Sequence, residues 1–343
     1  MRRRWIFWLL VFVFVGLVIA RFDEVRHLAI TLSHGHWGWV AAAAFGQLLF
    51  YVLYAAIYEV SFSAVGVHSR IFDLLPVVFV SIFVNVAVPT GGTSGMALFV
   101  DDASRRGQSP ARTAAGLLLV LAADFSAFTV LLGLGLANLA TLRDLSNYEL
   151  AASSILLGII AALALALFLG LWRPWLLLHT LQAVQKAVNG IGSRFKRANL
   201  LSEHWAADNA MEFAAASAAI AAHPVKLTKA FGISLLAHLV NFGSLYALFL
   251  AFYHPIPPGS LLSGYAIGNL FWIVSITPQG VGIVEGVMTL VFVTLAVPVG
   301  LAAIIVIAYR GLGFWLPMIA GFCLLHRIRS FKDIEYIQSD KHA

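Results

Sequence analysis

The sequence predicts an all-α polytopic membrane protein with about six full transmembrane helices and two re-entrant hairpins broken by Pro and Gly. The first observation is composition, because 61% of the 343 residues are hydrophobic, only 11% are charged, and the mean hydropathy is +0.89. Soluble domains carry roughly 25% charged residues, which excludes a soluble core. The other two observations are a series of apolar runs of spanning length and two further apolar segments that are interrupted.

Six uninterrupted apolar runs are each long enough to cross a bilayer, which takes about 20 residues of helix. The first follows three arginines and shows no small-residue cleavage site, so we expect a retained helix rather than a signal peptide. The expected spans are 5–24, 37–57, 113–140, 151–178, 230–252 and 299–325.

One polar stretch separates the spans, at 179–229, and we expect it to be cytoplasmic. Its Ala-rich part, 208–222, has too few large apolar residues to span, so it should lie at the interface or against the bundle. We therefore expect one integral membrane domain over 1–330 and a short cytoplasmic tail over 331–343.

The two interrupted segments are 74–100 and 261–297, giving eight apolar segments in all. Their breaks are Val88–Gly95 and Thr277–Gly282. An unpaired backbone N–H or C=O is so costly in hydrocarbon that a broken helix requires protein or a water-filled cavity around it. A pair of such segments, one in each half of the chain, points to a transport site.

The positive-inside rule favours re-entrant hairpins over full crossings. If 74–100 crossed once, the basic loop after it would lie outside. If it returns to the side it entered, only Arg21, Arg26 and Arg143 lie outside and Arg310 lies within a span. The other 18 of the 22 Lys and Arg residues are then cytoplasmic, as are both termini, in a multi-pass protein of the cytoplasmic membrane. The net charge of +6 thus reflects membrane orientation, and no nucleic acid is expected as a partner.

Three ionisable residues fall within the apolar segments: Asp124, Glu285 and Arg310. A lone arginine at the bilayer centre costs about 2.5–3.5 kcal/mol on insertion scales, and a carboxylate partner would offset much of this. Either Glu285 or Asp124 is a possible partner. The pair could be purely structural, or Arg310 could bind a lipid phosphate, for which its planar fork is suited.

The two breaks also carry candidate substrate-binding residues. Glycines there allow backbone N–H groups to face a cavity, and the helix after each break presents its positive N-terminus to an anion. Alternatively, the glycines only permit a tight turn. Neutral polar residues at both breaks favour binding, and the candidates are Asn85, Thr90, Gly91, Gly92, Thr277, Pro278, Gln279 and Gly280. For His238, Asn241 and Asn269 we expect mainly hydrogen bonding between helices.

Three segments resemble signatures of one known family. They are Asn85–Gly92, Thr277–Glu285 and Tyr309–Pro317, and the likeness extends over about 5–328. The chain resembles the flippase-like membrane region of lysylphosphatidylglycerol synthases, which also occurs as stand-alone proteins. The resemblance implies a membrane domain that translocates or handles lipid.

The chain departs from that family in two respects. Thr90 and Gln279 depart from the glycine-rich sequence that is more usual at the two breaks. The sequence also ends about 18 residues after its last span, so we expect neither the soluble aminoacyl-transferase domain of the two-domain synthases nor lipid aminoacylation.

The expected function is therefore translocation of an anionic, aminoacylated or polyprenyl-linked lipid across the cytoplasmic membrane. The alternative is a membrane-embedded enzyme or subunit of lipid-linked glycan or phospholipid modification, and a related possibility is a structural partner of a separately encoded lipid-modifying transferase. No ATPase motif is present, and with Cys323 as the single cysteine we expect neither a metal centre nor a cofactor.

Overall fold

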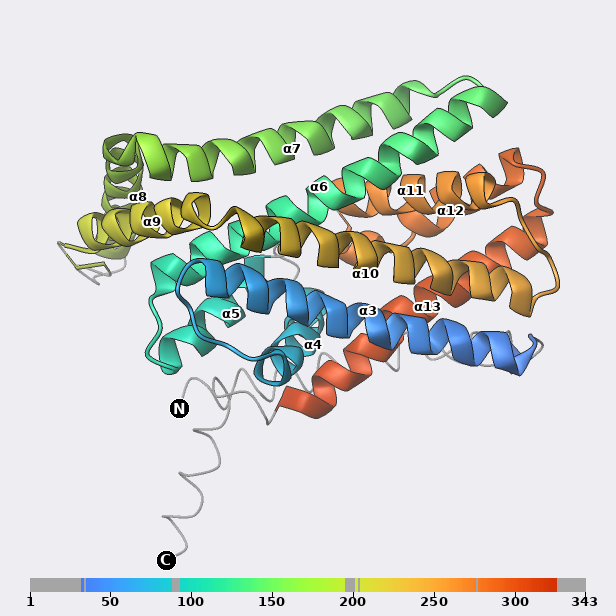
Figure 1. The fold of residues 1–343 in the computed structure, drawn as a ribbon, viewed down its shortest axis with the longest axis horizontal. Coiled ribbons are helices and arrows are strands. Elements are labelled where there is room, and N and C mark those ends of the chain that lie inside the picture. The colour runs from blue at the N-terminus through green and yellow to red at the C-terminus, as the bar shows by residue number, and fades with distance from the viewer. Residues whose placement is uncertain are drawn as a thin grey trace, which may run out of the picture.

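The computed structural model describes residues 32–33, 35–87, 93–194, 201–202, 204–275 and 277–325, and within these ranges it is all-helical. Figure 1 shows the helices running roughly side by side. In chain order they are α3 (Trp37–Ala64), α4 (Ile71–Ala87), α5 (Thr93–Arg105), α6 (Pro110–Leu142), α7 (Asn147–Trp172), α8 (Pro174–Arg194), α9 (Trp205–Ala222), α10 (Pro224–Ala251), α11 (Pro258–Val274), the 3-10 turn η1 (Pro278–Gly280), α12 (Ile283–Thr294) and α13 (Val299–Leu324).

Five of these helices, α3, α6, α7, α10 and α13, are long and apolar enough to cross a membrane, and α4 and α12 are shorter apolar helices. This confirms five of the six predicted full spans, while the predicted span 5–24 lies outside the described residues. The boundary predicted at 178 is wrong, because α7 ends at Trp172. The φ angle of Arg173 is −137°, in the range expected of a residue that precedes proline, and α8 begins at the next residue, Pro174.

The Ala-rich segment forms α9, which packs against α6, α7 and α8. It therefore lies against the bundle, one of the two placements predicted for it. The side chain of Glu212 on α9 accepts a hydrogen bond from Ser109, whose side chain also caps the N-terminus of α6. This contact joins the cap of one long helix to the surface of a shorter one.

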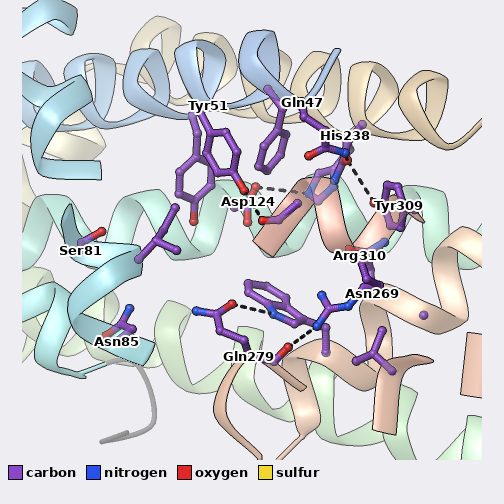
Figure 2. A pocket seen from close by; sticks show the side chains of 18 of the residues that line it. Gln47, Tyr51, Ser81, Asn85, Asp124, His238, Asn269, Gln279, Tyr309 and Arg310 are labelled. Carbon is purple, nitrogen blue, oxygen red and sulfur yellow. Dashed lines mark hydrogen bonds and ion pairs between the residues drawn. The ribbon is translucent and has the colours of Figure 1, made fainter. Parts of the chain in front are cut away.

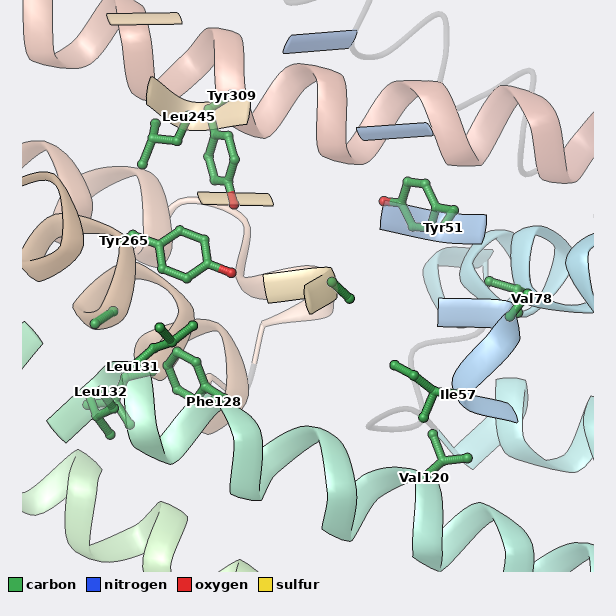
Figure 3. Packing of buried hydrophobic residues seen from close by; sticks show 14 of the residues in the cluster. Tyr51, Ile57, Val78, Val120, Phe128, Leu131, Leu132, Leu245, Tyr265 and Tyr309 are labelled. Carbon is green, nitrogen blue, oxygen red and sulfur yellow. The ribbon is translucent and has the colours of Figure 1, made fainter. Parts of the chain in front are cut away.

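The core is built around α3 and α10, which make the most extensive interhelical contact among the described elements. Small residues permit the close approach, as is usual for helices in membranes. A Cβ on Gly46 of α3 would lie 3.2 Å from the Cβ of Ser244 on α10, and one on Gly321 of α13 would clash with the carbonyl of Phe79 on α4. Figure 3 shows the buried side chains around this pair, including Phe128, Leu245 and Tyr265.

The two interrupted segments occupy opposite ends of the bundle. Figure 1 shows the loops before α4 and after α5 at the left, and the loops before α11 and after α12 at the right. Within each segment the two helices pack on one another, and η1 contacts α4. Through this contact with α4, the second break lies within the bundle rather than at one of its ends.

Candidate functional site

A cavity lies where the two interrupted segments meet the long helices. Its volume is about 200 Å³, many times the roughly 10–15 Å³ that a single water requires. Residues from α3, α4, α6, α10, α11, η1, α12 and α13 line it. The polar and aromatic ones are Gln47, Phe50, Tyr51, Tyr54, Tyr58, Ser81, Asn85, Asp124, His238, Asn241, Asn269, Trp272, Gln279, Tyr309 and Arg310.

Arg310 lies at the middle of α13 and reaches the second break. Its Nε donates to Glu285 Oε1 at 2.9 Å, and its Nη2 donates to the backbone carbonyl of Gln279. The question left open by the sequence is thus answered, because the partner of Arg310 is Glu285 rather than Asp124. These bonds use two of the five guanidinium N–H donors, so others remain for a ligand in the cavity.

Glu285 has a second role in the same turn. Its Oε2 accepts the backbone N–H of Gly282 at 2.6 Å, which satisfies one of the free donors at the start of α12. The turn contains one strained residue, because Gln279 has a φ of 56°, whereas the positive φ values of Gly280 and Gly282, 69° and 85°, carry no such cost for glycine. One ion pair therefore holds a strained turn against a neighbouring helix.

Asp124 lies at the middle of α6 and faces the cavity with His238 of α10 (Figure 2). The His238 Nε2 and Asp124 Oδ1 atoms are 3.2 Å apart, and His238 Nδ1 lies 3.0 Å from the hydroxyl of Tyr265. Both Asp124 and His238 are buried. The cavity thus contains a carboxylate that faces a histidine rather than an arginine.

A hydrogen-bonded cluster of neutral side chains joins three of the lining helices. Asn241 Oδ1 accepts from Gln47 Nε2 at 2.8 Å and from the Tyr309 hydroxyl at 3.0 Å. Gln47 also donates to Ser244, whose hydroxyl donates to a carbonyl of α3. The expected interhelical role of His238 and Asn241 is confirmed, whereas Asn269 donates to the carbonyl of Tyr265 within its own helix.

The first break is closed by Asn85. Its Oδ1 accepts from the backbone N–H of Gly95 at 2.7 Å and from the Ser94 hydroxyl at 2.8 Å. The side chain therefore caps α5 from the end of α4, and it also lines the cavity. A Cβ on Gly95 would lie 2.6 Å from Asn85 Nδ2, so glycine is required for this approach.

The predicted site residues divide into three groups. Asn85, Asp124, Gln279 and Arg310 line the cavity. Thr277, Pro278, Gly280 and Glu285 do not line it but belong to the adjoining turn and the first turn of α12, where the Thr277 hydroxyl donates to the Val281 carbonyl at 3.2 Å. Thr90, Gly91 and Gly92 lie outside the described residues.

Sequence reasoning missed one face of α3. Gln47, Tyr51, Tyr54 and Tyr58 follow each other at intervals of four, three and four residues, which places them on one side of a helix. All four line the cavity, and the Tyr51 hydroxyl donates to the carbonyl of Gly313 on α13. A polar and aromatic stripe along an otherwise apolar span was the signal that could have identified them.

Metal ligands do not gather in the part of the chain that the structure describes, where no three His, Cys, Asp or Glu side chains converge. The chemistry of the cavity is instead that of one guanidinium, one buried carboxylate with a histidine, and several neutral hydrogen-bonding groups. This set can bind and orient a phosphorylated or otherwise polar group within a largely apolar bundle.

Comparison with known proteins agrees with this architecture. No curated protein matches the sequence. A family model, that of the lysylphosphatidylglycerol synthase TM region, matches residues 5–321, which is nearly the whole chain and includes every residue that lines the cavity. The chain therefore belongs to the family of the lysylphosphatidylglycerol synthase transmembrane region.

Proposed function

We propose that the protein translocates a lipid across the cytoplasmic membrane by accepting its headgroup in the central cavity while the acyl or prenyl chains stay in the bilayer. The substrate class is a phospholipid, with or without an aminoacyl group, or a polyprenyl-linked lipid. The single observation that carries the proposal is the cavity itself, which lies at the middle of the long helices and contains Arg310 and Asp124. Charged groups at this depth are costly and are retained where they act on a polar cargo.

In this proposal the segments α4–α5 and α11–α12 are re-entrant hairpins that enter from opposite faces. Three observations support it: the helices of each segment pack on one another, each segment begins and ends at the same end of the bundle, and η1 contacts α4. Irregular backbone at membrane depth is tolerated where it lines a cavity, and the second break does so through Gln279, while Asn85 at the end of α4 lines the same cavity.

The proposed orientation places the end of the bundle with the α3–α4 and α5–α6 loops in the cytoplasm. Arg70, Arg105 and Arg106 lie at this end, as does Arg173 beyond α7. At the opposite end the α6–α7 loop carries Arg143, which pairs with Glu149 at 2.6 Å. The excess of basic residues on one side follows the positive-inside rule.

The experiment that tests the function is lipid scrambling by the purified chain in liposomes that contain headgroup-labelled phosphatidylglycerol, with external dithionite as the quencher. Translocation predicts protein-dependent bleaching of the inner-leaflet label, lost in Arg310→Ala and kept in Arg173→Ala. Arg173 is the matched control because it is an exposed arginine outside the cavity. Neutral and polyprenyl-phosphate labels define the headgroup class.

Absence of flux with every label would contradict translocation. If the chain then still bound these lipids, or bound a separately encoded lipid-modifying transferase, the cavity would belong to a subunit of a lipid-modifying enzyme instead.

A further inference from the structure

The cavity contains two ionisable pairs of different character. Arg310 and Glu285 form an ion pair with a permanent cation, since guanidinium stays protonated in proteins. Asp124 instead faces His238, whose Nε2 is 3.2 Å from Asp124 Oδ1, and histidine is the side chain that ordinarily gains or loses its charge between pH 5 and 8. The net charge of the second pair, Asp124 and His238, therefore depends on whether it holds an added proton, whereas the net charge of the first pair, Arg310 and Glu285, does not.

The geometry of the second pair leaves room for that proton. Asp124 is 6% exposed and His238 is 8% exposed. Although Asp124 Oδ1 and His238 Nε2 are 3.2 Å apart, neither atom has a hydrogen-bond partner of good geometry among the described residues. Two buried polar atoms that face each other without a formed hydrogen bond are costly, and a proton between them, carried by His238 Nε2 or by the carboxyl group, together with a small side-chain rotation would satisfy both.

Among the residues that the structure describes, the surroundings of Asp124 and His238 offer no further cation that could replace that proton. The remaining ionisable groups that line the cavity are three tyrosines of α3 and Tyr309 of α13, while Tyr265 of α11 contacts His238. The lining residues of α4 and α11 are uncharged, and α12 contributes Glu285 through its pairing with Arg310. With His238 neutral, the groups Arg310, Glu285, Asp124 and His238 sum to one negative charge, and one added proton brings the sum to zero.

An anionic headgroup changes this balance. If a phosphate entered beside Arg310 while the second pair stayed unprotonated, the site would hold two negative charges in a region of low dielectric. If one proton is taken up together with the phosphate, the site holds only one net negative charge. Because such coupling is reciprocal, a proton on the pair strengthens phosphate binding as much as phosphate binding strengthens proton binding.

We propose that the Asp124–His238 pair is a proton-binding site that couples transport to the proton gradient, so that an anionic lipid headgroup enters the cavity together with one proton. The proton comes from the aqueous side that the cavity faces, resides on the pair, and leaves with the headgroup on the other side. This proposal rests on the proposed translocase function and adds the energy source and the stoichiometry of one proton per headgroup.

The test uses the liposomes described above, with labelled phosphatidylglycerol, a pH-sensitive dye in the lumen and an imposed pH gradient. Coupling predicts that an acidic exterior accelerates inward movement, by at most about tenfold per pH unit for a single proton. It also predicts that inward movement of phosphatidylglycerol acidifies the lumen, which a zwitterionic lipid should not do.

Two variants localise the effect. In Asp124→Asn and in His238→Gln, the rate of lipid movement should no longer depend on the pH gradient, and lipid movement should no longer acidify the lumen. This holds even if the variant moves lipid more slowly than wild type. His223→Gln is the matched control, because His223 is exposed and its side chain forms no cap hydrogen bond. Size-exclusion profiles show whether each variant folds.

The wild-type measurement decides the proposal even if both variants fail to fold. Lipid movement that is equal for both gradient directions and leaves the lumenal pH unchanged would overturn the coupling and leave translocation intact. Gradient dependence that persists in a folded Asp124→Asn protein would overturn the assignment to this pair. Absence of any lipid movement would instead overturn translocation, and the coupling with it.

Discussion

The two breaks in the bundle are stabilised in different ways. At the first, a neutral amide on α4 caps the next helix along the chain, so that Asn85, Ser94 and Gly95 form a local closure. At the second, the support comes from a different helix, where Arg310 of α13 binds both Gln279 and Glu285. The first closure uses neutral groups of two helices that are neighbours in the chain, whereas the second uses a charge that a phosphate in the cavity could compete for. On the proposed function, we therefore expect the second break to respond to ligand more strongly than the first.

The largest expected effect on lipid movement comes from substitutions in the ion pair that supports the second break. Arg310→Ala should reduce lipid movement by about tenfold or more, because a charge-assisted hydrogen bond contributes roughly 1.5–3 kcal/mol. Glu285→Ala should also abolish movement, since it removes both the partner of Arg310 and the cap on Gly282. The measurement is scrambling per folded protein in liposomes.

A double variant separates a binding role from a structural one. In Arg310→Gln/Glu285→Gln both charges of the ion pair are removed, so no unpaired charge remains. If Arg310 only balances Glu285, this protein should regain the activity that Arg310→Gln alone loses. If Arg310 binds the phosphate, the double variant stays inactive although its thermal unfolding midpoint recovers, and recovery of transport would contradict the binding role.

A smaller effect is expected from the neutral cluster beside the ion pair. Asn241→Ala leaves the donors of Gln47 and Tyr309 without their shared acceptor, whereas Tyr309→Phe removes a single hydrogen bond. Hydrogen bonds between membrane helices average about 0.6 kcal/mol and reach about 1.7. Asn241→Ala should therefore lower the unfolding midpoint in detergent clearly more than Tyr309→Phe, and equal shifts would show that the two bonds do not share one acceptor.

The long helices were predictable because hydropathy reports length and lipid contact directly, and five predicted spans match helices of the structure. The pairing of Arg310 with Glu285, 25 residues earlier, was not predictable. It depends on the rotation of α13 about its axis and on the conformation of the second break, and hydropathy reports neither. The tyrosines of α3 were missed for a related reason, since aromatic residues are common in spans and only their position relative to α4 and α13 shows that they face a cavity.

The first break should respond less strongly and independently of ligand. Asn85→Ala removes the side chain that caps α5, and loss of such a cap typically costs about 1 kcal/mol. Asn85→Asp keeps an acceptor oxygen and should restore most of the stability. Addition of phosphatidylglycerol should raise the unfolding midpoint of wild type and of Asn85→Ala by similar amounts, and failure to do so in Asn85→Ala would show that both breaks are coupled to the ligand.

The smallest effect is expected at Gln279, where the backbone and the side chain have opposing preferences. Its φ of 56° is in the left-handed region, which costs a non-glycine residue about 1–2 kcal/mol, so glycine would relieve strain. The side chain, however, accepts a hydrogen bond from Trp272 at 3.3 Å and lines the cavity. Gln279→Gly should thus change the unfolding midpoint little, while Gln279→Ala, which keeps the strain and loses the contact, should lower it. Because the Arg310 bond at this position goes to the backbone carbonyl, either variant should retain it, and loss of transport in both would assign the Gln279 side chain itself to headgroup binding.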